Sequence, residues 1–129
     1  MSSVNERQVG GDHYKGTTLQ HWDIMAKYKV PYLEGHLTKY LRHRKKNGLQ
    51  DVEKMMHFAD KLIESVDTID YTPFGRVPMK VLQQFCVEQS YNFLESRILI
   101  FALTWRDHFE LEELKLSVQA LIDEYSASK

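Results

Sequence analysis

The sequence predicts an all-α fold, a small helical bundle of two helical hairpins preceded by an irregular N-terminal arm. Three observations predict this class. Apolar residues recur at helical spacing in the long segments, and the alternation typical of strands is absent from them. The 3 prolines and 6 glycines gather mainly at the breaks between these segments. A chain of 129 residues suits one small fold. We divide it into an arm (1–16), a basic hairpin (17–70) and an acidic C-terminal hairpin (71–129) with a structural or oligomerising role.

The first hairpin follows from the spacing of apolar residues. After the glycine-rich arm, a short helix is expected over about residues 22–29, stopping before Pro31. A longer helix is expected over about 32–46, and Asn47-Gly48 is then typical of a turn or a C-cap. The next helix, over about 49–69, has the clearest apolar stripe: Val52, Met55, Met56, Ala59, Leu62, Ile63, Val66 and Ile69. Because the connection is short, the two long helices should pack as an antiparallel hairpin.

A linker separates this hairpin from the second. Residues 70–78 hold two of the three prolines, and Pro78 suits the first turn of a helix. Asn92 and Glu95 form a capping-box pattern, which marks the start of another helix. Three further helices are therefore expected over these ranges: about 79–89, 93–106 and 110–125.

A weak internal repeat relates the two hairpins. The segment 32–34 (YLE) aligns with 93–95 (FLE), and after a two-residue gap in the turn, 62–64 (LIE) aligns with 121–123 (LID). Any two amphipathic hairpins can align in this way, so the match leaves open whether the repeat is real. In a real repeat the second copy has lost the basic cluster, since Ile100 stands in place of Lys39.

The overall charge excludes several classes of protein. Lys+Arg is 17 and Asp+Glu is 18, a net charge of −1, so neither bulk nucleic-acid binding nor polybasic membrane binding is expected. The single cysteine, Cys86, excludes an internal disulfide, and no apolar run is long enough to span a membrane. Since the N-terminus also lacks the apolar core of a signal peptide, we expect a cytoplasmic globular protein.

Positive charge is nevertheless concentrated in one segment. Residues 36–46 (HLTKYLRHRKK) hold five Lys or Arg, two His and no acid, a local charge of about +5. At helical spacing these side chains share a face, so a hairpin brings them into one cleft with residues of the next helix. Such a cleft suits the phosphate of a nucleotide, with an aromatic ring stacking on the base. The alternative is a solvated face whose charges pair with Asp51, Glu53 and Asp60.

The candidate ligand-binding residues come from three segments. The hairpin supplies His36, Lys39, Tyr40, Arg42, His43, Arg44, Lys54 and His57. Trp22 is a further ring for stacking on a base. A glycine pair in the arm can direct N–H groups at an anion, and the candidates there are Gly11, His13, Tyr14 and Lys15. No H-E-x-x-H zinc motif is present, so no protein-bound metal is predicted. The P-loop motif is also absent, so classical P-loop phosphoryl transfer is not supported by the sequence pattern.

The arm QVGGDHYK, the segment 22–24 (WDI) and the segment TKYLRHRKKNGLQDVEKMMHFADKLIE together resemble the SaV-like family of small phage proteins, often named nucleotide kinases. The resemblance covers about residues 8–66. The recurring residues of that family fall on Gly11, His13, Tyr14, Lys39, Tyr40, Asp51 and Lys54. The chain departs from the family at His36, where members often have Asn. It is also one residue short between Tyr40 and Asn47, so the family arginine corresponds to Arg42 or His43.

The resemblance implies a phage protein of the host-cell cytoplasm that phosphorylates deoxynucleotides, because one characterised relative is a nucleoside monophosphate kinase. The catalytic candidates are then Asp51, Lys39 and Arg42, with Mg²⁺ bound together with the nucleotide. Two alternatives stay open. The protein could sequester a host nucleotide or a cyclic-nucleotide defence signal without catalysis, or it could be a module that binds a host protein.

We also expect a homo-oligomer, by default a symmetric dimer. The C-terminal hairpin carries several large aromatic side chains, and some of them are expected to face the partner. The candidates are Phe101, Trp105, Phe109 and Tyr125.

Overall fold

Helices follow one another along the whole described chain. They are α2 (His21–Tyr28), α3 (Tyr32–Thr68), α4 (Met79–Glu88), α5 (Phe93–Thr104) and α6 (His108–Ala127). The computed structural model describes residues 20–74 and 77–127, and for residues 42–47 it describes the backbone alone. No strand occurs in these ranges, which confirms the predicted all-α class. None of the described helices is long and apolar enough to cross a membrane.

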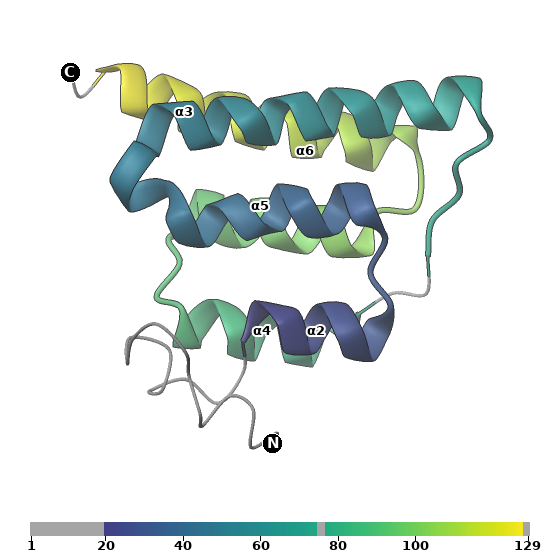
Figure 1. Ribbon diagram of the computed structural model, residues 1–129, viewed down its shortest axis with the longest axis horizontal. Helices are drawn as coiled ribbons and strands as arrows, with labels where there is room; N and C mark the ends of the chain where they lie inside the picture. The colour runs from purple at the N-terminus through teal and green to yellow at the C-terminus, as the bar shows by residue number, and fades with distance from the viewer. Residues whose placement is uncertain (1–19, 75–76, 128–129) are drawn as a thin grey trace.

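Helix α3 reverses its direction. Its helical backbone continues through 37 residues, including Asn47-Gly48, yet the ring centroids of Tyr32 and Phe58 lie 6.4 Å apart. In a straight helix, residues this far apart in sequence would be about 39 Å apart. Helix α3 therefore has a first arm (residues 32–41) and an antiparallel second arm (residues 48–68), as Figure 1 shows. The predicted hairpin is confirmed, whereas the predicted helix break at Asn47-Gly48 is wrong.

Gly48 lets the end of α6 approach the second arm closely. A Cβ atom placed on Gly48 would overlap the ring of Tyr125, which lies in the last turns of α6. The glycine is thus required by a neighbouring helix, since its own backbone is helical and needs no special conformation. This contact explains why position 48 holds a glycine although it lies inside a helix.

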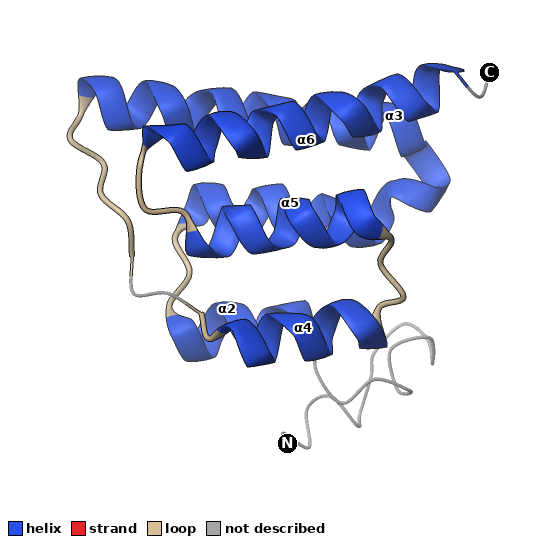
Figure 2. Cartoon of the chain, turned by 180° about the vertical axis from the view of Figure 1, so that it is seen from behind, coloured by secondary structure: helices blue, strands red, loops and turns tan. Residues whose placement is uncertain are grey.

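The helices form three layers of two. Helices α2 and α4 lie side by side in one layer, the first arm and α5 in the next, and the second arm and α6 in the third (Figures 1 and 2). The apolar stripes face inward between them, and the core includes fully buried side chains from five helices. Among the largest are Ile24, Leu37, Met55, Leu62, Phe85, Leu99 and Leu114. Cys86 belongs to this core, and burial raises the pKa of its thiol.

The two hairpins bury equivalent positions, which supports the internal repeat. With the alignment predicted from the sequence, most buried positions of the first hairpin fall on buried positions of the second. The pairs include Glu34 with Glu95, Leu37 with Ile98, Val52 with Leu111, Met55 with Leu114, Ala59 with Val118, and Leu62 with Leu121. The exceptions are Asp51 and Ser65, which align with the less buried Glu110 and Glu124. The repeat thus fixes which side of each helix faces the core.

The repeat also includes the helix that precedes each hairpin. Lys29 ends α2 with φ 52°, and Ser90 follows α4 with φ 57°, at the same spacing from the next helix. Just beyond them the N–H of Val30 bonds the carbonyl of Met25 (3.1 Å), and the N–H of Tyr91 bonds that of Cys86 (3.0 Å). Both bonds have the six-residue geometry of a Schellman cap. One unit therefore comprises α2 and α3, and the other α4, α5 and α6.

Capping residues set the helix boundaries in the second unit. Asn92 Oδ1 accepts from the N–H of Glu95 (2.9 Å), and Glu95 Oε1 accepts from the N–H of Asn92 (2.7 Å), which confirms the predicted capping box. Helix α6 begins earlier than predicted because Asp107 accepts from the N–H of Glu110 (2.9 Å) and so caps its first turn.

A buried carboxylate joins three segments of the fold. Glu34, on the first arm, has no exposed surface. Its Oε1 accepts a hydrogen bond from the Tyr71 hydroxyl (2.7 Å), and its Oε2 accepts one from Trp105 Nε1 (3.0 Å). Trp105 is 2% exposed, so it is not one of the aromatic side chains that could face a partner chain. The linker and the end of α5 are both held against the first arm through this one side chain.

Replacing Tyr71 by phenylalanine should lower the free energy of unfolding by about 1–3 kcal/mol, because the buried Glu34 loses a donor. The effect should depend on pH. Burial, and then the bond and charge of Glu34, raise the pKa of Tyr71 above its ordinary value of 10.0. The folded protein therefore holds this proton more tightly than the unfolded chain, and the stabilisation is lost as the pH rises above about 10.

Urea unfolding of the wild type and Tyr71→Phe across this pH range tests the prediction. The stability gap between the two proteins should narrow as the pH rises, and a constant gap would contradict it. Tyr32→Phe is the matched control, because Tyr32 is 68% exposed.

Replacing Gly48 by alanine should destabilise the protein by about 1–3 kcal/mol, because the added methyl group overlaps the Tyr125 ring. Without that overlap the sign should reverse, since alanine favours a helix over glycine by about 1 kcal/mol. Urea unfolding of Gly48→Ala, Tyr125→Ala and the double variant separates the two effects. The idea fails if Gly48→Ala stabilises the protein while Tyr125 is present.

Candidate functional site

Four aromatic rings gather between the two arms of α3. Phe58, on the second arm, lies 5.6 Å from the His36 ring and 6.1 Å from the Tyr40 ring, measured between centroids, and both pairs are stacked. Tyr32 adjoins His36 at 4.1 Å and Phe58 at 6.4 Å. We call these four residues the ring cluster. Helical spacing places three of them on one side of the first arm, and the reversal of α3 brings the fourth against them.

One positive side chain contacts the ring cluster directly, and Lys39 and His57 are the cluster's neighbours in sequence. The Lys54 ammonium group lies 5.5 Å from the centroid of the Tyr40 ring, a cation–π distance. Lys39 on the first arm and His57 on the second arm are exposed. Among the side chains that the structure describes, neither Lys39 nor Lys54 forms an ion pair with a carboxylate. Both cations are therefore able to bind an anion from solution.

On the equivalent face of the second unit, the positive side chain forms an ion pair with a carboxylate of the same chain. Position by position, Arg97 replaces His36, Glu113 replaces Lys54, and Ser117 replaces Phe58. The Arg97 guanidinium bonds Ser117 Oγ (2.9 Å) and Glu113 Oε1 (3.0 Å) and lies 4.8 Å from the centroid of the Phe101 ring. The cation of this face is thus paired within the chain. Only the face of the first unit combines stacked rings with unpaired lysines among the described residues.

The structure places the other predicted residues in different ways. Arg42, His43 and Arg44 belong to the helical backbone of α3, but their side chains lie outside the described part of the chain. The candidates of the N-terminal arm (residues 1–16) also lie outside it; they are Gly11, His13, Tyr14 and Lys15. Trp22 is 50% exposed on α2, in the layer farthest from the second arm (Figure 1).

Asp51 differs from the other candidates of the second arm. It is 5% exposed and lies on the core side of the helix, whereas Lys54 is exposed. Asp60, which the alternative interpretation paired with the basic segment, pairs with Lys115 of α6 (3.0 Å). In the described ranges, no group of three His, Cys, Asp or Glu side chains lies close enough to hold a metal ion.

Sequence reasoning missed two members of the ring cluster, Phe58 and Tyr32. The signal for Phe58 was its position beside the stripe formed by Met55, Ala59 and Leu62, where a polar side chain is usual. An aromatic residue at such a position needs a neighbour on another element. For Phe58 that neighbour is the first arm, which becomes clear only from the reversal of α3.

The chain matches no protein-family model, no curated protein and no solved structure. The chemistry of this site is therefore inferred from its own residues.

Replacing Arg97 by methionine should destabilise the protein by about 1–2 kcal/mol, because Glu113 and Ser117 lose a charged donor that is only partly exposed. Arg106→Met is the control. Arg106 pairs with Glu110 but is 62% exposed, so its loss should matter little. Chemical denaturation of both variants measures their free energies of unfolding. Equal losses of stability would contradict a stabilising role of the Arg97 ion pair in the second unit.

Proposed function

We propose that the protein binds a nucleotide on the exposed face of the α3 hairpin, with the phosphate near Lys54 and the base against the ring cluster. The observation that carries this proposal is the Lys54 ammonium 5.5 Å above the Tyr40 ring, beside three further rings and without a carboxylate partner among the described side chains. A nucleotide combines an anion with a flat aromatic ring, so it matches both halves of this arrangement.

The chemistry of the face favours a small anion over a long polyanion. Lys39 and Lys54 come from opposite arms, and the basic segment 42–46 lies at the reversal that joins them. The charge of the whole chain is −1, so the positive potential is confined to this hairpin. A phosphate group bound here would be held by the point charges of Lys39 and Lys54.

Turnover of the nucleotide is a further part of the proposal, and it rests on the resemblance to the phage nucleotide kinases. In that version the site transfers a phosphoryl group from a nucleoside triphosphate to a deoxynucleoside monophosphate, with Mg²⁺ bound by the nucleotide. Lys39, Lys54 and Arg42 would stabilise the charge on the transferred group. The burial of Asp51 favours the alternative, in which the protein holds the nucleotide without changing it, because this carboxylate lies on the core side of its helix.

Calorimetric titration with ATP, dTMP, dGMP and a cyclic nucleotide, each with Mg²⁺, tests the proposal. Lys54→Gln should weaken the binding of the preferred nucleotide about tenfold, a loss of about 1.4 kcal/mol. Tyr40→Leu should weaken it as well, because it removes both the ring beneath Lys54 and one stacked member of the cluster. Chromatography of the recovered ligand then separates phosphoryl transfer from unchanged binding.

Lys61→Gln is the matched control for Lys54→Gln. Lys61 is an exposed lysine of the same arm, but it already pairs with Glu64 (2.9 Å). Its replacement should leave nucleotide binding unchanged. Equal affinities of wild type and Lys54→Gln, or no heat with any nucleotide, would contradict the proposal and favour a protein-binding module.

A further inference from the structure

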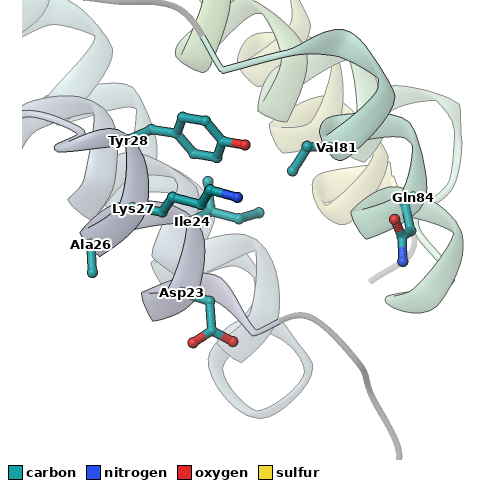
Figure 3. Close-up of a pocket in the computed structure, with 7 residues that line it drawn as sticks. All are labelled: Asp23, Ile24, Ala26, Lys27, Tyr28, Val81 and Gln84. Carbon is teal, nitrogen blue, oxygen red and sulfur yellow. The ribbon is translucent and has the colours of Figure 1, made fainter. Parts of the chain in front are cut away.

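A cavity lies between α2 and α4, in the layer farthest from the second arm of α3. It has a volume of about 520 Å³, which is within the range of small-molecule sites. Ile24 and Val81 contribute apolar surface from the two helices, and Tyr28, Lys27 and Gln84 contribute polar groups. Figure 3 shows Lys27 and Tyr28 extending from α2 in the direction of α4.

The cavity lies where the two units of the fold face each other. Asp23 of α2 and Gln84 of α4 occupy equivalent positions of the repeat, and both line it. The polar surface is nevertheless unequal, because the equivalents of Lys27 and Tyr28 in α4 are Glu88 and Gln89, which do not line the cavity. The α2 side therefore determines what charge the cavity accepts.

Two charged side chains line the cavity, Lys27 and Asp23, and they differ in what they already bind. The Lys27 ammonium group lies 5.6 Å from the centroid of the Tyr28 ring, and no described carboxylate forms an ion pair with it. The other charge, the Asp23 carboxylate, accepts a hydrogen bond from the Gln20 backbone (3.1 Å) at the start of α2 and so serves as a helix cap. A cation beside an aromatic ring and an apolar floor suits a flat ring that carries a negative group.

We propose that this cavity binds a small aromatic anion, an aromatic carboxylate or the phosphate ester of an aromatic ring. The ring lies between Tyr28 and the apolar surface of Ile24 and Val81. The anionic group is bound by the Lys27 ammonium, and the Gln84 amide donates to a further acceptor. This site is separate from the ring cluster of α3, and it does not depend on nucleotide binding there.

Amide-resolved NMR titration of the full chain with four probes tests the proposal. The probes are benzoate, phenyl phosphate, neutral benzamide and cationic benzylamine. Benzoate or phenyl phosphate should shift the amide signals of α2 and α4 around Tyr28 and Val81 and should bind at least about tenfold more tightly than benzamide. Benzoate alone would identify a carboxylate site, and phenyl phosphate alone a phosphate-ester site.

Two variants and two controls define the site. Lys27→Gln should remove the preference for the anion, and Val81→Phe should abolish binding by filling the cavity, with helical circular dichroism unchanged. Lys80→Gln, an exposed lysine of α4 outside the cavity, should bind as the wild type does, and so should Lys54→Gln. Equal binding of benzoate and benzamide, shifts away from α2 and α4, or normal binding by Lys27→Gln would each overturn the proposal.

Discussion

Burial of the Glu34 carboxylate is the constraint on which the arrangement of the two units depends. A carboxylate without contact with water is costly unless its oxygens accept hydrogen bonds, and here one donor comes from 37 residues and the other from 71 residues along the chain. The first arm, the linker and the end of α5 must therefore meet at one point with the correct register. The equivalent Glu95 is buried too, but it serves the cap of its own helix. The repeat thus uses one residue type for two purposes, a connection between units in the first copy and a local cap in the second.

Inward faces and outward faces of the two units follow different rules. Inward positions keep apolar side chains in both copies, as Val52 and Leu111 or Leu62 and Leu121 show, because they fill one common core. Outward positions exchange charge between the copies, since Lys54 corresponds to Glu113 and His36 to Arg97. One face is consequently neutralised by an internal ion pair, while the other presents cations and rings to solvent. The inward-facing residues specify the fold and the outward-facing residues specify the chemistry. Only the inward-facing residues are similar in the two units.

Local patterns in the sequence predicted much of the fold. The apolar stripe of the second arm and the Asn92 capping box both depend on neighbours a few residues away. Both are confirmed, except that Ile69 at the end of the stripe is 68% exposed. The need for glycine at position 48 was not predictable in this way, because it depends on the ring of Tyr125 in α6. The same distinction between local and distant contacts applies to the candidate site. Helical spacing grouped His36 with Tyr40, but the role of Phe58 depends on the reversal of α3, and the partners of Glu34 are distant in sequence.

The repeat has a consequence for how such a protein can change over generations. In an assembly of identical chains, every substitution appears in all copies, so a change that suits one binding face alters the other at the same time. Joining two similar units by residues 69–78 removes this coupling and keeps the units at a high effective concentration. Each face can then be mutated independently while the shared core preserves assembly. A single covalent link thereby allows one half to specialise in recognition and the other to serve as its scaffold.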